Sequence, residues 1–375
     1  MFSEKINEYI HIAENIFGTQ YQQQDIDNIL DALEKGKNIS LENAWMLLTT
    51  QNIDQYNRII NIAGEITKKY HGNVVGMIAP LYFSNICWND CACCDMSCKN
   101  ISLKRHTLVL EEFIDEFNRL KNIGYKTIEI VAGGFSLKSK VGEMFLKFIE
   151  YGKKNIPNFA FFVDTLTLDD YKTFADPNIT MIHRQESYIK NDYMKMVLWW
   201  PKKDFEKRVN AHECRLQAGG KKIGLSVLAG IANDFLKDVF MVLAHGKYLE
   251  DTYGIPPSCF GTVRIHPITR KEISEFKKIP DREMYLATAL YRIMFPKTNI
   301  IITSREDTET IRKHIEAWAT FANATCTTVI GGYKLMEEGL LNENIGQFNH
   351  GNPSPEEVKK SLASIGKTID RNKEL

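Results

Sequence analysis

Short apolar runs alternate with amphipathic helical patterns from about residue 72 to residue 330, and no other feature of the sequence limits the fold so strongly. Eight runs have the length and composition of buried strands: 74–78, 127–131, 160–163, 180–183, 222–227, 261–265, 299–302 and 325–330. Helical patterns lie between them, at 110–123, 143–155, 203–218, 234–253, 282–295 and 307–321. Parallel strands need crossover helices, so the pattern predicts an α/β fold, a (β/α)8 TIM-type barrel.

The segments before and after this alternation have a different pattern of apolar residues. Apolar residues recur at helical spacing in Ile26, Ile29, Leu30 and Leu33. We therefore expect three parts: a helical N-terminal extension over 1–70, the barrel over 71–335, and a helical C-terminal tail over 336–375 that packs on the barrel. Catalytic residues of such a barrel lie at the C-terminal ends of the strands and in the loops that follow.

Composition narrows the class of partner. Lysine plus arginine and aspartate plus glutamate both number 47, so the balanced charge gives no argument for a nucleic-acid partner. No apolar stretch reaches the ~18 residues of a membrane span. The first residues lack the apolar region of a secretory signal. We expect a cytoplasmic protein with no membrane partner.

Five of the eight cysteines fall between Cys87 and Cys98. In a reducing compartment such a group indicates metal binding or catalysis rather than disulfides. Cys87, Cys91 and Cys94, just beyond the first predicted strand, have the spacing C-x3-C-x2-C. Three thiolates on one loop can hold three irons of a cubane and leave the fourth iron open.

The residues alone leave two alternatives to this assignment. Cys98 offers a second register, in which Cys91, Cys94 and Cys98 are the ligands. A structural zinc site would also use thiolates, although no second cysteine or histidine pair follows at zinc-finger spacing.

The cysteine spacing is that of the radical S-adenosylmethionine (SAM) superfamily, and further motifs narrow the resemblance. The segment 79–85 before the cysteines resembles the aromatic-amino-acid lyase branch, as do the motifs that follow in order at 131–134, 185–188, 201–208, 223–230, 263–267, 304–306 and 331–333. That branch contains the tyrosine lyases of thiamine biosynthesis and of [FeFe]-hydrogenase maturation, and the tryptophan lyase that makes 3-methyl-2-indolic acid.

This resemblance implies a [4Fe–4S] cluster on Cys87, Cys91 and Cys94, whose open iron binds SAM. Reductive cleavage of SAM would give a 5′-deoxyadenosyl radical that abstracts hydrogen from a small substrate. The electron would come from a low-potential donor of the flavodoxin or ferredoxin type. Cys93 stands where the superfamily usually has an aromatic residue, so the roles of Cys93 and Cys98 stay open.

The resemblance also implies roles for single residues. They are Gly133 and Gly134 beside the SAM amino group, Glu186 on a polar group of SAM, Arg208 on the SAM carboxylate, Arg305 on the substrate carboxylate, and Arg264 and Thr327 along the substrate pocket. The acidic residue that usually follows the glycines is absent, because Phe135 stands there.

The expected reaction is carbon–carbon bond cleavage or rearrangement in an aromatic amino acid or a related compound. No cysteine follows Cys326, so the second cluster of the hydrogenase-maturation lyase, and with it that activity, is disfavoured. Two other functions remain open. One is the synthesis of an unusual cofactor such as the pyridinol of iron-only hydrogenase. The other is a non-catalytic Fe–S or zinc protein, which would bind metal without cleaving SAM.

Overall fold

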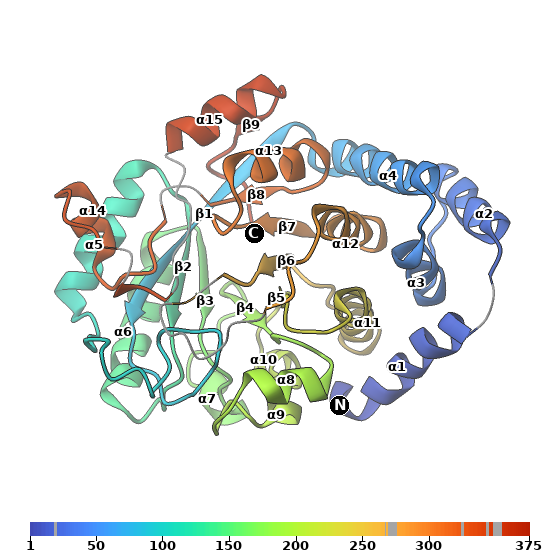
Figure 1. Ribbon diagram of the computed structural model, residues 1–375. Coiled ribbons are helices and arrows are strands. Elements are labelled where there is room, and N and C mark those ends of the chain that lie inside the picture. Colours follow the sequence, from blue (N-terminus) through green and yellow to red (C-terminus); the bar gives the residue numbers. More distant parts are fainter. Residues whose placement is uncertain (19–20, 267, 269–275, 324–325, 343–344, 348–354) are drawn as a thin grey trace.

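The computed structural model describes residues 1–375 except 19–20, 267, 269–275, 324–325, 343–344 and 348–354. Eight parallel strands follow one another around a closed barrel, and β1 pairs with both β2 and β8 (Figure 1). They are β1 (Val74–Ser84), β2 (Thr127–Ala132), β3 (Asn158–Phe162), β4 (Thr180–Arg184), β5 (Lys222–Ala229), β6 (Cys259–Arg264), β7 (Asn299–Ile302) and β8 (Phe321–Ala322). The predicted (β/α)8 barrel is confirmed.

Helices connect the strands and cover the outside of the barrel. They are α5 (Leu110–Ile123), α6 (Lys140–Asn155), α7 (Leu168–Lys172), α8 (Lys190–Met196), α9 (Phe205–Val209), α10 (Ala211–Gln217), α11 (Phe235–Tyr253), α12 (Asp281–Met294) and α13 (Thr308–Ala317). The single helix expected at 203–218 is two short helices, because Asn210 ends α9 and begins α10.

The eighth strand lies earlier than expected, so the prediction of a strand at 325–330 is wrong. Phe321 and Ala322 form β8, although Phe321 was assigned to the end of the preceding helix. Two residues suffice because β8 only has to bridge β7 and β1. Asn323 then continues the contact through its side chain, whose Nδ2 donates to the Ile78 carbonyl at 2.7 Å. Thr325 lies outside the described residues, and residues 326–330 form no strand.

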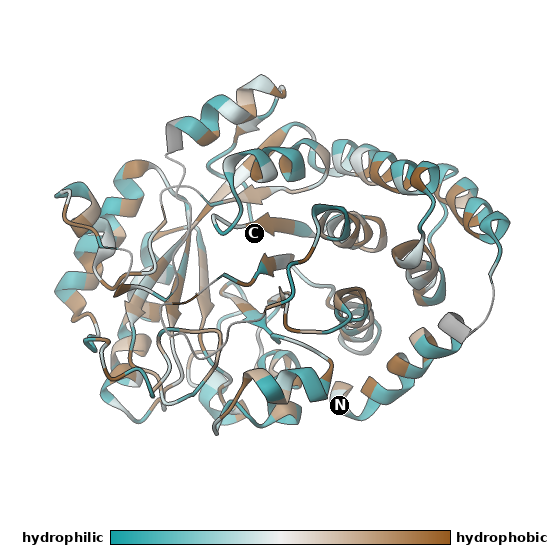
Figure 2. Ribbon diagram, viewed as in Figure 1, coloured by the Kyte–Doolittle hydropathy of each residue, from teal (hydrophilic) through white to brown (hydrophobic). Residues whose placement is uncertain are grey.

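Four helices precede the barrel and form an arc outside it (Figure 1). They are α1 (Phe2–Gly18), α2 (Gln23–Glu34), α3 (Leu41–Thr49) and α4 (Ile53–His71). Helices α1 and α3 pack on α11, and α4 packs on α12 and α13, so buried residues of the extension join the core of the barrel. The outer faces of these helices carry most of their hydrophilic residues (Figure 2). No helix in the described part of the chain is both long and apolar enough to cross a bilayer.

The last part of the chain covers the N-terminal ends of the strands. After α14 (Gly332–Glu337) and α15 (Pro355–Ser364), β9 (Thr368–Ile369) pairs with β1. Leu375 then packs at the centre of the barrel floor (Figure 1) against Ile78, Ala160, Cys259, Ile301 and Phe321. Asn158 and Asn299, which begin β3 and β7, each donate a side-chain N–H at 3.0 Å to a carbonyl of the tail. With this end closed, a functional site has to open at the opposite end.

Candidate active site

The cysteine loop follows β1 and lies at the C-terminal end of the barrel. Cys87, Cys91, Cys93 and Cys94 line one cavity of about 600 Å³. Cys98 is exposed and is not among the residues that line it. All five thiols are free. The register Cys87, Cys91 and Cys94 therefore places all three sulfurs around one space, whereas the register that includes Cys98 does not.

Three N–H groups point at sulfurs of the proposed ligands. The Gly134 and Asn89 amides donate to Cys87 Sγ at 3.2 and 3.4 Å, and Gln347 Nε2 donates to Cys94 Sγ at 3.3 Å. Gln347 also accepts a hydrogen bond from the Tyr82 hydroxyl at 2.8 Å. Hydrogen bonds to sulfur are one of the means by which proteins tune Fe–S clusters.

Burial raises the pKa of Cys87 to about 11 and that of Cys93 to about 12. A thiolate in this loop therefore needs positive charge close by, which bound iron would supply. No three Cys, His, Asp or Glu side chains among the described residues converge where a single metal ion could bind. A cubane does not require such convergence, because each thiolate binds a different iron. The donor set of the loop is therefore compatible with a [4Fe–4S] cluster.

Gly133 and Gly134 allow the end of β2 to lie directly against the cysteine loop. A Cβ atom at Gly133 would lie 2.5 Å from Cys87 Cβ and 2.9 Å from the Ile86 carbonyl oxygen. A Cβ at Gly134 would collide with the side chains of Trp88 and Asn89. Both glycines line the cavity, and they also allow the first cysteine to lie against the end of β2.

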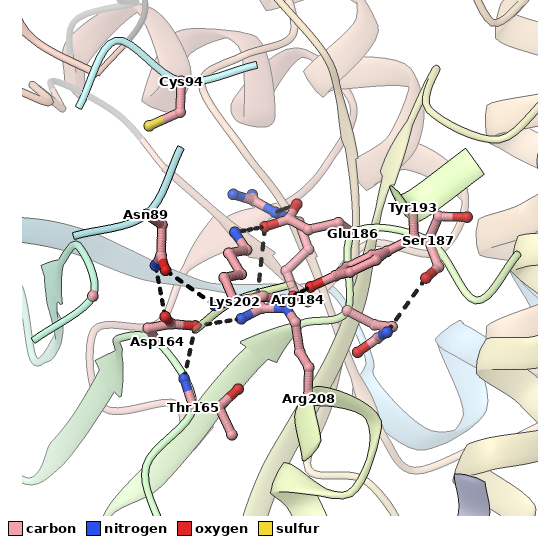
Figure 3. A network of polar contacts seen from close by, with 12 residues as sticks. Asn89, Cys94, Asp164, Thr165, Arg184, Glu186, Ser187, Tyr193, Lys202 and Arg208 are labelled. Atoms are coloured by element: carbon pink, nitrogen blue, oxygen red, sulfur yellow. Dashed lines mark hydrogen bonds and ion pairs between the residues drawn. The ribbon is translucent and has the colours of Figure 1, made fainter. Parts of the chain in front are cut away.

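Glu186 follows β4 with a φ of 73°, in the left-handed region, and lies at the centre of an ionic network (Figure 3). Its carboxylate contacts Arg184 Nε at 2.9 Å, Lys202 Nζ at 2.7 Å and Arg208 Nη2 at 3.5 Å. Burial would raise the pKa of Glu186, but these cations outweigh burial and hold the pKa well below its usual range. Glu186 is therefore a carboxylate throughout the neutral range.

Asp164, two residues past β3, extends the network to the cysteine loop (Figure 3). Its carboxylate accepts hydrogen bonds from Arg208 Nη1 and Asn89 Nδ2, both at 2.6 Å. Asn89 Oδ1 in turn accepts a hydrogen bond from the Lys202 backbone amide at 3.1 Å. Arg208 is thus fixed between two acids, and the network is joined to the loop that carries the cysteines.

Sequence reasoning missed three members of this network, Asp164, Arg184 and Lys202. The signals were present, because Asp164 directly follows the third expected strand and Lys202 lies within the motif at 201–208. The cavity wall holds four cations, Arg184, Lys202, Arg208 and Arg305, and only two carboxylates, Asp164 and Glu186. This excess of positive charge complements cysteine thiolates and any carboxylate ligand.

A second cavity, of about 840 Å³, occupies the barrel interior between the cysteine loop and the floor. Phe162, Arg184 and Arg305 line both cavities, so the two spaces adjoin. Arg305 follows β7, and burial lowers its pKa to about 10, so it remains a cation at neutral pH. A group bound in the inner cavity would lie next to one bound beside the cysteines.

The other two residues expected along the substrate pocket lie away from it. Arg264, at the end of β6, forms ion pairs with Glu306 at 2.8 Å and Asp281 at 2.5 Å and lines neither cavity. Thr327 is buried, and its hydroxyl accepts from the Val329 amide at 3.1 Å. Its neighbour Thr328 lines the inner cavity instead.

The chain matches no family model over its length. Among characterised proteins it resembles 2-iminoacetate synthase of Salmonella typhimurium, with 25% identity over 347 residues, which cover 91% of this chain and 88% of the relative. It also resembles 3-methylornithine synthase of Methanosarcina acetivorans, with 22% identity over 85% of this chain and 87% of the relative.

The chain also resembles solved structures of related enzymes. The FeFe-hydrogenase maturase HydG from Carboxydothermus hydrogenoformans aligns with a TM-score of 0.90 and 28% identity, covering 99% of this chain and 85% of that one. Methylornithine synthase aligns with a TM-score of 0.69 over 91% of this chain and 97% of that one, and at 18% identity this match concerns the fold alone.

Proposed function

We propose that the chain is a radical SAM enzyme, which cleaves S-adenosylmethionine reductively and uses the resulting radical on a small substrate, an aromatic amino acid or a related compound. A [4Fe–4S] cluster with SAM bound to it supplies one-electron cleavage of the sulfonium and a 5′-deoxyadenosyl radical. In this proposal Cys87, Cys91 and Cys94 hold the cluster, and the electron comes from a flavodoxin- or ferredoxin-type donor. Breakage or rearrangement of a carbon–carbon bond in the substrate follows.

The observation that carries the proposal is the contact between the two cavities. The outer cavity has the thiols and a surplus of cations, and the inner one is enclosed by the barrel. In this proposal Arg305, which borders both, holds the substrate carboxylate, since its planar fork pairs with carboxylates in two hydrogen bonds. The reacting carbon would then lie beside the outer cavity, shielded from water by the barrel wall.

The polar wall of the outer cavity would orient SAM. Arg208 and Glu186 are the residues that we assign to its carboxylate and another of its polar groups. Their mutual pairing and their contacts with Asp164 and Lys202 hold them in place before a ligand arrives. Such preorganisation lowers the cost of ordering side chains on binding.

The test is an anaerobic assay of 5′-deoxyadenosine formed from SAM by the reconstituted and reduced protein, with and without each amino acid. We expect cleavage that one amino acid accelerates while it is consumed. Cys87→Ala should lose both the iron and the cleavage. Cys98→Ala, which alters an exposed thiol outside the cavity, is the matched control and should retain both. A protein that binds iron but leaves SAM intact would be the non-catalytic Fe–S protein instead.

A further inference from the structure

One acidic side chain faces the inner cavity and has no part in the network around Glu186. Glu129 lies in the middle of β2, level with Pro80 on β1 and Ala160 on β3. Its neighbours Ile128 and Ile130 are fully buried on the other face of the strand, whereas Glu129 is partly exposed to the cavity. No hydrogen bond or ion pair joins its carboxylate to any described residue.

The surroundings of Glu129 do not compensate a negative charge. Most of the cavity wall is apolar and includes Ile78, Ile182, Val263 and Ile301. Burial raises the pKa of Glu129 to about 7, and Arg184 offsets this only in part. A buried carboxylate without a partner costs several kcal/mol of folding free energy. Glu129 therefore destabilises the fold unless a ligand pairs with its carboxylate.

The position of Glu129 indicates which part of a ligand would reach it. Glu129 precedes Ala132, which lines the outer cavity, by three residues of strand, or about 10 Å. The inner cavity therefore has a cationic end at Arg305, next to the outer cavity, and an acidic group well below it. In an amino acid held by its carboxylate at Arg305, the α-amino group stays near that end. Only the end of the side chain reaches Glu129.

We propose that Glu129 determines the substrate specificity of the reaction proposed above by accepting a hydrogen bond from the end of the substrate side chain. The substrate is then an amino acid whose side chain ends in an N–H or O–H donor. A protonated amine satisfies the site best, because it brings a positive charge into contact with a carboxylate that no described cation pairs with. A phenolic hydroxyl satisfies the hydrogen bond without the charge.

The experiment measures binding of the twenty standard amino acids and of norleucine to the reconstituted protein by calorimetry, and their effect on 5′-deoxyadenosine formation. Two matched pairs give the sharpest comparison: lysine with norleucine, and tyrosine with phenylalanine. We expect one donor-bearing member to bind, and its partner without the donor to be weaker by about a hundredfold or more. Binding of an aliphatic or acidic amino acid in preference, or of none at all, overturns the proposal.

Two variants assign the preference to Glu129 itself. Glu129→Leu should reduce the difference within the responsive pair to about threefold or less, since the hydrogen-bond acceptor is gone. Glu129→Gln should retain part of the response to a hydroxyl and lose most of the response to an amine. Glu143→Gln, at an exposed position on α6, is the control and should leave the preference unchanged. A preference that survives in Glu129→Leu rejects the assignment.

Thermal stability separates a role in recognition from a structural role. If Glu129 only supported the fold, Glu129→Leu would lower the melting temperature, whereas removing an uncompensated buried carboxylate should leave it unchanged or raise it. The calorimetric measurement also distinguishes the proposal for Glu129 from the proposal that the protein cleaves SAM. Selective binding of a donor-bearing amino acid without SAM cleavage would support Glu129 and reject the proposed reaction, and cleavage stimulated equally by both members of each pair would do the reverse.

Discussion

Among single residues, Glu186 has the largest expected effect on stability. Its carboxylate is buried among Arg184, Lys202 and Arg208. Glu186→Gln therefore keeps the size of the side chain but removes the negative charge that these three cations contact. We expect a loss of about 3–5 kcal/mol in the free energy of unfolding, measured by urea denaturation at pH 7. Glu206→Gln breaks the half-exposed pair with Lys190 and should cost about 0–1 kcal/mol. Similar losses in the two variants would contradict this account.

Glu129 should give the stability of the protein an unusual pH dependence. Its pKa is about 7 in the folded chain against an ordinary value of 4.5, so the folded state binds more protons between these values. The contribution of Glu129 to the free energy of unfolding therefore falls as the pH rises through this window, by up to about 3 kcal/mol. Glu186 and Asp164, whose pKa values are lowered, stabilise the fold above their unfolded pKa and lose this contribution in acid.

The measurement compares wild type with Glu129→Gln at pH 5 and pH 8. The variant should be more stable than wild type at pH 8 and nearly equal to it at pH 5. The other titratable groups that line the cavity with Glu129 are Tyr82, Arg184, Cys259, Cys326 and Arg305. The pKa values of Tyr82, Arg184, Cys259 and Arg305 lie above this window, so these four groups do not mask the effect. An equal difference at the two pH values would show that Glu129 does not titrate there.

Between elements, the packing of the β2 end against the cysteine loop should control the loading of metal. Gly134→Ala forces Trp88 and Asn89 away and so moves the loop that begins at Cys87. We expect markedly less iron per chain after reconstitution, with the circular dichroism of the barrel unchanged. In Gly64→Ala, on α4, the nearest contact of the new methyl group is the Ala317 carbonyl at 3.8 Å, so iron content should not change. The free energy of unfolding of this control should rise by up to about 1 kcal/mol.

The regular elements show where sequence reasoning succeeds. The expected helix at 110–123 matches α5, because its apolar periodicity and the glycine after it are local signals. The two-residue β8 is too short to show any periodicity, and its strand geometry is imposed by β7 and β1. The break at Asn210 likewise has no breaker residue to announce it.

In the candidate site, too, some residues could be identified from the sequence and others could not. The three cysteines lie within one short motif, and Glu186 and Arg208 each lie within another. These residues could therefore be identified from the sequence. Asp164 and Glu129 acquire their properties from distant side chains: Asp164 from Arg208, and Glu129 from the largely apolar wall to which several other strands contribute. Only closure of the barrel brings these partners together. The place of Asp164 after the third expected strand indicates the catalytic end of the barrel, but the sequence does not show its pairing with Arg208, and nothing in it marks Glu129 as a cavity residue.

For the molecule as a whole, the tail should contribute to stability at the barrel floor. Leu375 is 5% exposed and fills the space between the N-terminal ends of the strands. Leu375→Ala should lower the free energy of unfolding by about 2–3 kcal/mol, since the residual cavity is lined by packed side chains. Leu340→Ala, at a leucine that is 67% exposed, should change it by less than about 0.5 kcal/mol. Equal effects would mean that the floor does not depend on the tail.

The contacts made by residues late in the chain also govern when the protein becomes competent during its synthesis. Strand β1 is among the first parts of the barrel to leave the ribosome, yet its partners β8 and β9 emerge more than 230 residues later. Gln347, which contacts both Tyr82 and Cys94, comes later still than β8. A nascent chain therefore exposes its cysteine loop for most of translation without the residues that enclose it. If the chain holds the proposed cluster, the cluster enters the finished pocket only after translation, and until then the exposed thiols can be oxidised.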